Sequence, residues 1–225
     1  MHPVALKYFF GGDLDAAADG VLTEIEMRLT WHPQRDLPLF DRIAKVGRAL
    51  LSLKELEYFG EPRGGSLAER LQGLIDRLLG PLETEWLGGP SSGPVVPRVK
   101  ALRMKILPEM VHGQTNEAER QRRWRQLADI YLAQQLSSYP PDYIAVQPSV
   151  DRLLETLERF EEDMTDRARV HGHLKVVIQV GEAIEVSPER DRAAKVDPLM
   201  TRIEHDLQTM LDQLAAESPV YRGKA

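Results

Sequence analysis

The pattern of hydrophobic and polar positions predicts a mostly helical chain. Apolar residues recur three or four positions apart in several stretches, which is the spacing of one helix face. The most regular stretch follows Ser149, a residue type that favours helix N-caps, and steps by three and four from Val150 through Leu157 to Met164. It spans about two heptads, which indicates packing against a core rather than a long coiled coil.

Seven helices are predicted in this way. Their approximate ranges are 14–31, 38–53, 66–82, 99–111, 116–136, 149–164 and 197–214. Besides Ser149, three of the starts carry capping signals: Ser66 with Glu69 three residues later, Asn116 with Glu119, and Asp197 followed by a proline. The prolines at positions 81 and 108 predict bends within two of the helices.

Two segments predict strands instead. Residues 1–10 are apolar and end at a glycine turn, and residues 174–186 are rich in β-branched side chains with a bend at Gly181. Two strands alone do not form a stable sheet, so they either pair with each other under the helices or belong to a larger sheet. The predicted fold class is mostly α (α+β), about seven helices with two short strand segments, one at the N-terminus and one near residues 174–186. We find no internal repeat at a fixed spacing.

The composition excludes several classes of function. The chain has 225 residues, no cysteine and a net charge of −6. Without cysteine there is no disulfide, thiolate nucleophile or iron–sulfur cluster, which fits a reducing compartment. The acidic balance makes nucleic acid a poor partner. No stretch approaches the roughly 18 consecutive apolar residues of a membrane-spanning helix, and the first residues lack the basic and long apolar regions of a signal peptide.

The candidate catalytic and metal-binding side chains form no recognised arrangement. The serines stand at predicted caps and in loops, and none has the glycine-flanked pattern of a hydrolase nucleophile. His171 and His173 lie two positions apart before the second strand, so both imidazoles would point to one side, as zinc ligands can. No third ligand has a matching spacing, and His112 is far away in the sequence. Solvated loop histidines are therefore the favoured interpretation.

Two runs of charge have both a functional and a structural interpretation. The acidic run could bind a hard cation, and the basic run surrounds a tryptophan and could contact anionic lipid. The acidic run lacks the loop of a calcium site, and the arginines spread around their helix, so we favour solvated faces and one buried tryptophan. The residues concerned are Glu161, Glu162, Asp163 and Asp166, and Arg120, Arg122, Arg123 and Arg125 around Trp124.

Two short segments resemble a known family. Pro3-Val4-Ala5-Leu6 is similar to a proline-valine-alanine-isoleucine strand of the glycerolipid acyltransferases, which acylate lysophosphatidic acid, and residues 176–186 resemble the closing strand of that domain. The resemblance covers about the first 10 residues and the last 50. It implies a core strand in residues 1–12, a helical subdomain or insertion in residues 13–170, and a closing strand with a terminal helix in residues 171–225.

In that family a histidine five positions before an aspartate acts as general base on the acceptor hydroxyl. This chain has no such pair, because His32 precedes Asp36 by four positions and His112 precedes Glu117 instead. The resemblance implies an acyltransferase-like protein, moving an acyl chain from a thioester donor to a glycerophospholipid acceptor, that is inactive alone. A missing upstream part would bind acyl-CoA or acyl-carrier protein and the lysophospholipid.

The implied location is cytoplasmic, with peripheral contact at the inner face of the membrane. We assign no catalytic, cofactor-binding or metal-ligating residue, no cofactor and no nucleic acid partner. Two alternatives stay open: a non-catalytic helical protein-interaction domain whose strands pair locally, and an enzyme of another type that uses His112 or His171. The acyltransferase interpretation predicts that both strand segments lie beside partners that this chain does not encode.

Overall fold

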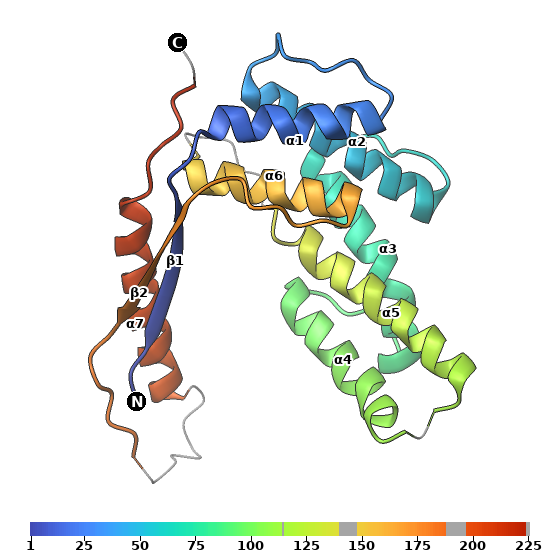
Figure 1. Ribbon diagram of the computed structural model, residues 1–225. Helices are drawn as coiled ribbons and strands as arrows, with labels where there is room; N and C mark the ends of the chain where they lie inside the picture. The colour runs from blue at the N-terminus through green and yellow to red at the C-terminus, as the bar shows by residue number, and fades with distance from the viewer. Residues whose placement is uncertain (114, 140–147, 188–196, 224–225) are drawn as a thin grey trace. The chain divides into compact units, whose positions relative to one another are not determined.

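The computed structural model describes residues 1–113, 115–139, 148–187 and 197–223 (Figure 1). These residues form seven α-helices and a two-stranded sheet, which confirms the predicted fold class. The strands are β1 (Val4–Phe10) and β2 (Leu174–Val180). The helices are α1 (Leu14–Arg28), α2 (Leu39–Phe59), α3 (Leu67–Leu87), α4 (Val95–Val111), α5 (Glu117–Leu136), α6 (Val150–Thr165) and α7 (Pro198–Ala216).

The chain folds into two compact units. Unit 1 comprises residues 1–44 and 146–225 and holds both strands with α1, α6 and α7, whereas unit 2 comprises residues 45–145 and holds α3, α4 and α5. Helix α2 begins in unit 1 and ends in unit 2. This division differs from the boundaries predicted after residues 12 and 170, because α1 and α6 pack on each other and belong with the strands.

In unit 1, β1 and β2 pair antiparallel over their full length, in the register that sets Val4 opposite Val180. A main-chain bond from the Gly181 N–H to the Pro3 carbonyl (2.8 Å) extends the pairing. A Cβ at position 181 would lie 2.9 Å from Pro3, so this close approach requires glycine. Of the two predicted arrangements, the strands adopt mutual pairing. The predicted continuation of the strand over residues 181–186 is wrong, because these residues form no regular strand.

Helix α7 covers one face of the sheet and lies beside both strands in Figure 1. Ala5 of β1 packs with Met210 and Leu214 of α7 in a small buried cluster, and Val177 of β2 packs against it. The predicted cap Asp197 begins this helix, its carboxylate accepting a main-chain N–H. Helix α7 thus covers one face of the two-stranded sheet, and the candidate site lies on the opposite face.

Helices α1 and α6 form the helical core of unit 1. Leu22 of α1 and Leu153 and Leu157 of α6 have no exposed surface. The predicted cap Ser149 begins α6, and its hydroxyl accepts the Arg152 N–H at 3.2 Å. The three- and four-residue spacing therefore identified the buried side of this helix correctly.

Helices α3, α4 and α5 pack against one another in unit 2. The predicted capping box of Ser66 and Glu69 begins α3. Both α3 and α4 continue as single helices past the prolines at positions 81 and 108. The largest fully buried apolar side chains at the centre of this unit are Leu74, Leu79, Leu102, Ile106 and Ile130.

Three glutamate–arginine pairs, here called the clamps, join successive helices, and the glutamate of each pair is fully buried. In each clamp the glutamate lies near the end of one helix, and the arginine is the fourth residue of the next. Two guanidinium nitrogens donate to the two carboxylate oxygens at 2.7–3.1 Å. The clamps are Glu26–Arg42 in unit 1, and Glu55–Arg70 and Glu83–Arg98 in unit 2.

The clamps recur at a spacing of 28 or 29 residues, which corrects the sequence-based conclusion that the chain has no repeat. Arg42, Arg70 and Arg98 are 28 residues apart, and each clamp glutamate is followed seven positions later by a proline. The main-chain N–H of the next residue donates to the same carboxylate in all three clamps, at 2.9–3.1 Å. The buried apolar residues one and four positions after each arginine also repeat: Ile43 and Val46, Leu71 and Leu74, and Val99 and Leu102.

The electrostatics of the clamps are those of structural ion pairs. The Arg70 guanidinium and a loop N–H hold the pKa of Glu55 below its ordinary value, although burial acts in the opposite direction. Burial likewise raises the pKa of Glu83, but Arg98 and the Ser91 N–H outweigh it and lower the pKa overall. A buried charge is tolerated when its partner and its hydrogen bonds are all present. Each clamp therefore fixes a loop and the following helix with one carboxylate.

Candidate functional site: the apolar face of the sheet

The face of the sheet opposite α7 is apolar and exposed. Side chains alternate between the two faces of a strand, and the register places the even-numbered residues of both strands on the same face. Seven of them, here called the apolar face, have exposed fractions between 44% and 61%. The apolar face consists of Val4, Leu6, Tyr8, Leu174, Val176, Ile178 and Val180.

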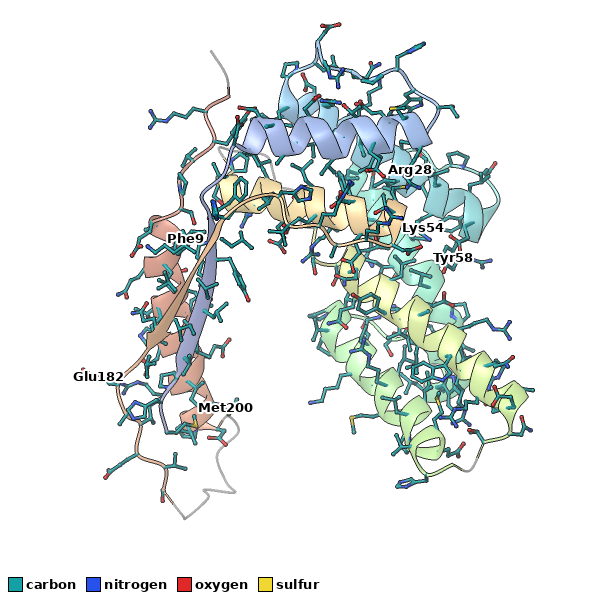
Figure 2. All side chains as sticks on the ribbon, viewed as in Figure 1. Phe9, Arg28, Lys54, Tyr58, Glu182 and Met200 are labelled. Atoms are coloured by element: carbon teal, nitrogen blue, oxygen red, sulfur yellow. The ribbon has the colours of Figure 1, made fainter. Side chains whose placement is uncertain are left out.

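The two lysines of the strands stand on the other face. The ammonium groups of Lys7 and Lys175 lie 5.1 and 5.5 Å from the ring centre of Phe9, which is labelled in Figure 2 near the end of β1. Gln179 also alternates onto that face, where its amide donates to Gln213 of α7 at 3.3 Å. The polarity of β2 is therefore largely reversed, because Lys175, which stays exposed, and Gln179 are on the side of α7, whereas four of its five apolar side chains face outward.

The outer edge of β2 is open in the part of the chain that the structure describes. The Gly181 N–H bonds the Pro3 carbonyl directly opposite it, and hydrogen-bonded residues alternate along an antiparallel strand. The odd-numbered residues of β2 therefore form the main-chain bonds to β1. The N–H and C=O groups of Val176 and Ile178 therefore point away from β1, and no described residue bonds them. The outer edge of β1 is partly closed instead, because Asp151 at the start of α6 accepts the Phe10 N–H at 2.7 Å.

A groove of about 640 Å³ lies beside the apolar face within unit 1. Leu6 and Tyr8 of β1 contribute apolar wall, and α6 contributes Arg152, Glu155 and Glu158. Burial raises the pKa of Glu158 above its ordinary value. An apolar surface with a charged rim is the composition of many protein docking sites.

His171, one of the predicted candidate residues, belongs to a cluster of ion pairs that ties the segment after α6 to the helices of unit 1. Its Nε2 lies 2.9 Å from Oε2 of Glu161, a buried carboxylate that also accepts Arg169. Arg169 in turn contacts Glu24 of α1. His173 is exposed, and within the described residues no group of three or more histidine or acidic side chains is placed to hold a metal ion.

The acidic run on α6 is divided by its burial. Glu161 is buried, whereas Glu162, Asp163 and Asp166 are exposed, so the expected solvated face holds for these three residues. His112 is exposed at the C-cap of α4. His112 belongs to unit 2, whereas the acidic run, His171 and His173 belong to unit 1.

The basic run on α5 is partly structural. Arg123 is buried and donates to Glu119 at 2.7 Å and to the Ile106 carbonyl at 3.1 Å. Consecutive residues are about 100° apart on a helix, so the next side chain points outward. The buried tryptophan expected at Trp124 is therefore wrong, since this side chain is 56% exposed. Trp86 of α3 packs there instead, with its ring centre 4.8 Å from the Arg123 guanidinium.

No helix in the described ranges is both long enough and apolar enough to cross a membrane. No family model, curated protein or solved structure matches the chain. The acyltransferase resemblance, its substrates and its membrane contact therefore stay predictions, and the geometry of unit 1 is the basis for a functional proposal.

Proposed function

We propose that this chain is a non-catalytic helical protein-interaction domain that binds another polypeptide on its apolar face. The observation that carries the proposal is the reversed polarity of β2, with Lys175 and Gln179 on the side of α7 and four apolar residues outward. In a sheet with one solvated face, polar side chains normally face water. A strand of reversed polarity suits a surface that a partner covers.

The stability of the sheet supports the same function. A pair of strands is marginal in water unless further strands or helices cover it. Helix α7 covers one side only, around Ala5 and Val177. Complete burial of an aliphatic or aromatic side chain stabilises by about 1.5–3 kcal/mol, so covering seven half-exposed residues would contribute several kcal/mol.

The charged side chains support a structural role rather than catalysis. The clamp carboxylates and Glu161 are each held by an arginine, and the imidazole of His171 is held by Glu161. Groups bound in this way position loops and helices, whereas a general base needs a free approach to the proton that it removes. We propose the cytoplasm as the location, because a chain without cysteine suits a reducing compartment.

The acyltransferase interpretation is the second candidate, and the open edge of β2 favours it, because neighbouring strands of a larger sheet would pair there. The upstream part of such a protein would supply those strands and the missing histidine–aspartate pair. The in-frame coding sequence before Met1 tests this candidate. A histidine five codons before an aspartate supports it, and a stop codon directly before Met1 contradicts it.

A photo-activated cross-linking residue tests the interaction function directly. We expect benzoylphenylalanine in place of Ile178 to form adducts with another polypeptide in the cells of origin, because this side chain stands at the centre of the apolar face. The same residue in place of Met200, an equally exposed apolar position at the start of α7, serves as the control and should form none. Equal labelling at the two positions, or none at Ile178, would contradict the proposed function.

A further inference from the structure

We propose that the polypeptide on the apolar face is a second copy of this chain, so that the protein is a dimer in which the two apolar faces pack on each other. This inference rests on the proposed function and names the partner. Two sheets that pack face to face interdigitate their inner side chains at a spacing of about 10 Å. In a two-fold arrangement, each copy offers the same seven side chains to the other.

The chemistry of the apolar face allows it to pack on itself. Its residues are valines, leucines, one isoleucine and one tyrosine, so a two-fold axis sets no like charges against each other there. Charged side chains of both signs, among them Arg152, Glu155 and Glu158 of α6, line the adjoining groove. A positive and a negative group on each copy can therefore face their opposites across the axis.

The area is sufficient for a dimer. At roughly 80–100 Å² of exposed surface for each half-exposed side chain, the seven residues present about 600 Å² per copy. Two copies would then bury about 1,200 Å², which reaches the lower limit of standard interfaces between proteins. A smaller patch would not hold two copies together without further contacts.

Face-to-face packing explains the apolar face better than pairing through the open edge of β2. If two β2 strands paired edge to edge, the sheet would have four strands, and its outward side would carry fourteen apolar residues instead of seven. Such pairing would satisfy the main-chain groups of Val176 and Ile178 but would leave all fourteen apolar side chains exposed, so it gains nothing from burying the apolar faces. Packing of the two faces removes that surface from water.

Light scattering after size-exclusion chromatography, with the full chain at roughly 50 μM, tests the inference at a concentration where an interface of micromolar affinity is populated. We expect a mass twice the 25.5 kDa of one chain. Ile178→Lys should weaken the dimer at least about 100-fold, because the ammonium group would be buried against an apolar surface. Met200→Lys, the matched control on α7, should leave the dimer intact. Far-ultraviolet circular dichroism should be the same for all three proteins, since both positions are exposed in one chain.

Each outcome separates the inference from its alternatives. A dimer that Ile178→Lys dissociates and Met200→Lys does not supports it. A dimer that survives Ile178→Lys contradicts it and indicates edge pairing, in which this side chain faces water. A single-chain mass for the unmodified protein overturns the second copy as partner, and the proposed function then stands only if Ile178 cross-links to a different protein.

Discussion

Glu83→Gln should destabilise unit 2 by about 3–5 kcal/mol, the usual cost of removing one partner from a buried ion pair. The glutamine keeps the shape of the side chain but removes its charge, so the buried Arg98 guanidinium would keep only Asp76, which is half exposed, as an acidic partner. The Ser91 N–H would also lose its carboxylate acceptor. Urea unfolding followed by tryptophan fluorescence measures the effect, because Trp86 and Trp124 lie in this unit.

Two further variants make this result specific to the clamp. Glu57→Gln removes a carboxylate that pairs with Lys54 on the surface of α2, and it should cost less than about 1 kcal/mol. The double variant Glu83→Met, Arg98→Leu removes both charges and should recover most of the loss, since apolar pairs often replace buried ion pairs at little cost. If Glu83→Gln costs no more than Glu57→Gln, the clamp is not a determinant of stability.

Acid should destabilise the protein in the range in which the Glu55 and Glu83 carboxylates take up protons. The pKa values of Glu55 and Glu83 are lower in the folded chain than the ordinary value of 4.5. Above pH 4.5 both groups are ionised in the folded and the unfolded states, so the clamps contribute fully. Below it the unfolded chain binds protons first, and the stabilisation is lost as the pH falls through the folded-state pKa values. The urea midpoint should therefore decrease steadily from pH 5 to pH 3.

The double variant Glu83→Met, Arg98→Leu is the control for acid as well. It lacks one titrating clamp, so its urea midpoint should depend less on pH between 5 and 3 than that of the unmodified protein. Identical pH profiles would show that the Glu83 carboxylate binds no more protons in the unfolded state than in the folded one. The proposed electrostatic role of this clamp would then be wrong.

Local signals in the sequence were sufficient to predict the helices. Ser66, Asn116, Ser149 and Asp197 each begin a helix as capping residues, because their side chains bond main-chain N–H groups that have no partner within the helix. The exposure of Trp124 could not be predicted in the same way. The side of α5 that faces the core is decided by the partners of Arg123 on α4, the Ile106 carbonyl and Glu109, which the pattern within α5 does not reveal.

The repeat could have been found from the sequence, but only by aligning three segments that have few identical residues. The three repeats share few identical residues. These are a glutamate, a proline seven positions later, and an arginine that is followed one and four positions later by apolar residues. Buried charges of this kind are rare, so a search for apolar periodicity does not detect them. The ion pair between the glutamate near the end of one helix and the arginine near the start of the next forms only when the chain folds.

The exposed side of the sheet could not be predicted, because both faces of β1 are mostly apolar and its one lysine, Lys7, lies on the side of α7. Ala5 and Phe9 alternate with Leu6 and Tyr8, so the pattern of this strand does not distinguish the covered face from the open one. The position of α7 decides it, through Met210 and Leu214. The polar residues of β2 would have indicated the opposite orientation, with Lys175 and Gln179 in water.

The most direct test of the account is the accessibility of the methyl groups on the apolar face. With methyl-labelled protein at high concentration, a soluble gadolinium chelate should broaden the Val111 resonances on α4 strongly and those of Leu6, Val176 and Ile178 weakly. Dilution below the dissociation constant of the complex, or the Ile178→Lys variant, should expose Leu6 and Val176 to the chelate. The contradicting result is that the methyl groups of the apolar face broaden as strongly as those of Val111 at every concentration, and also when the protein that cross-links to Ile178 is added. No polypeptide then covers this face, and the proposed function is wrong.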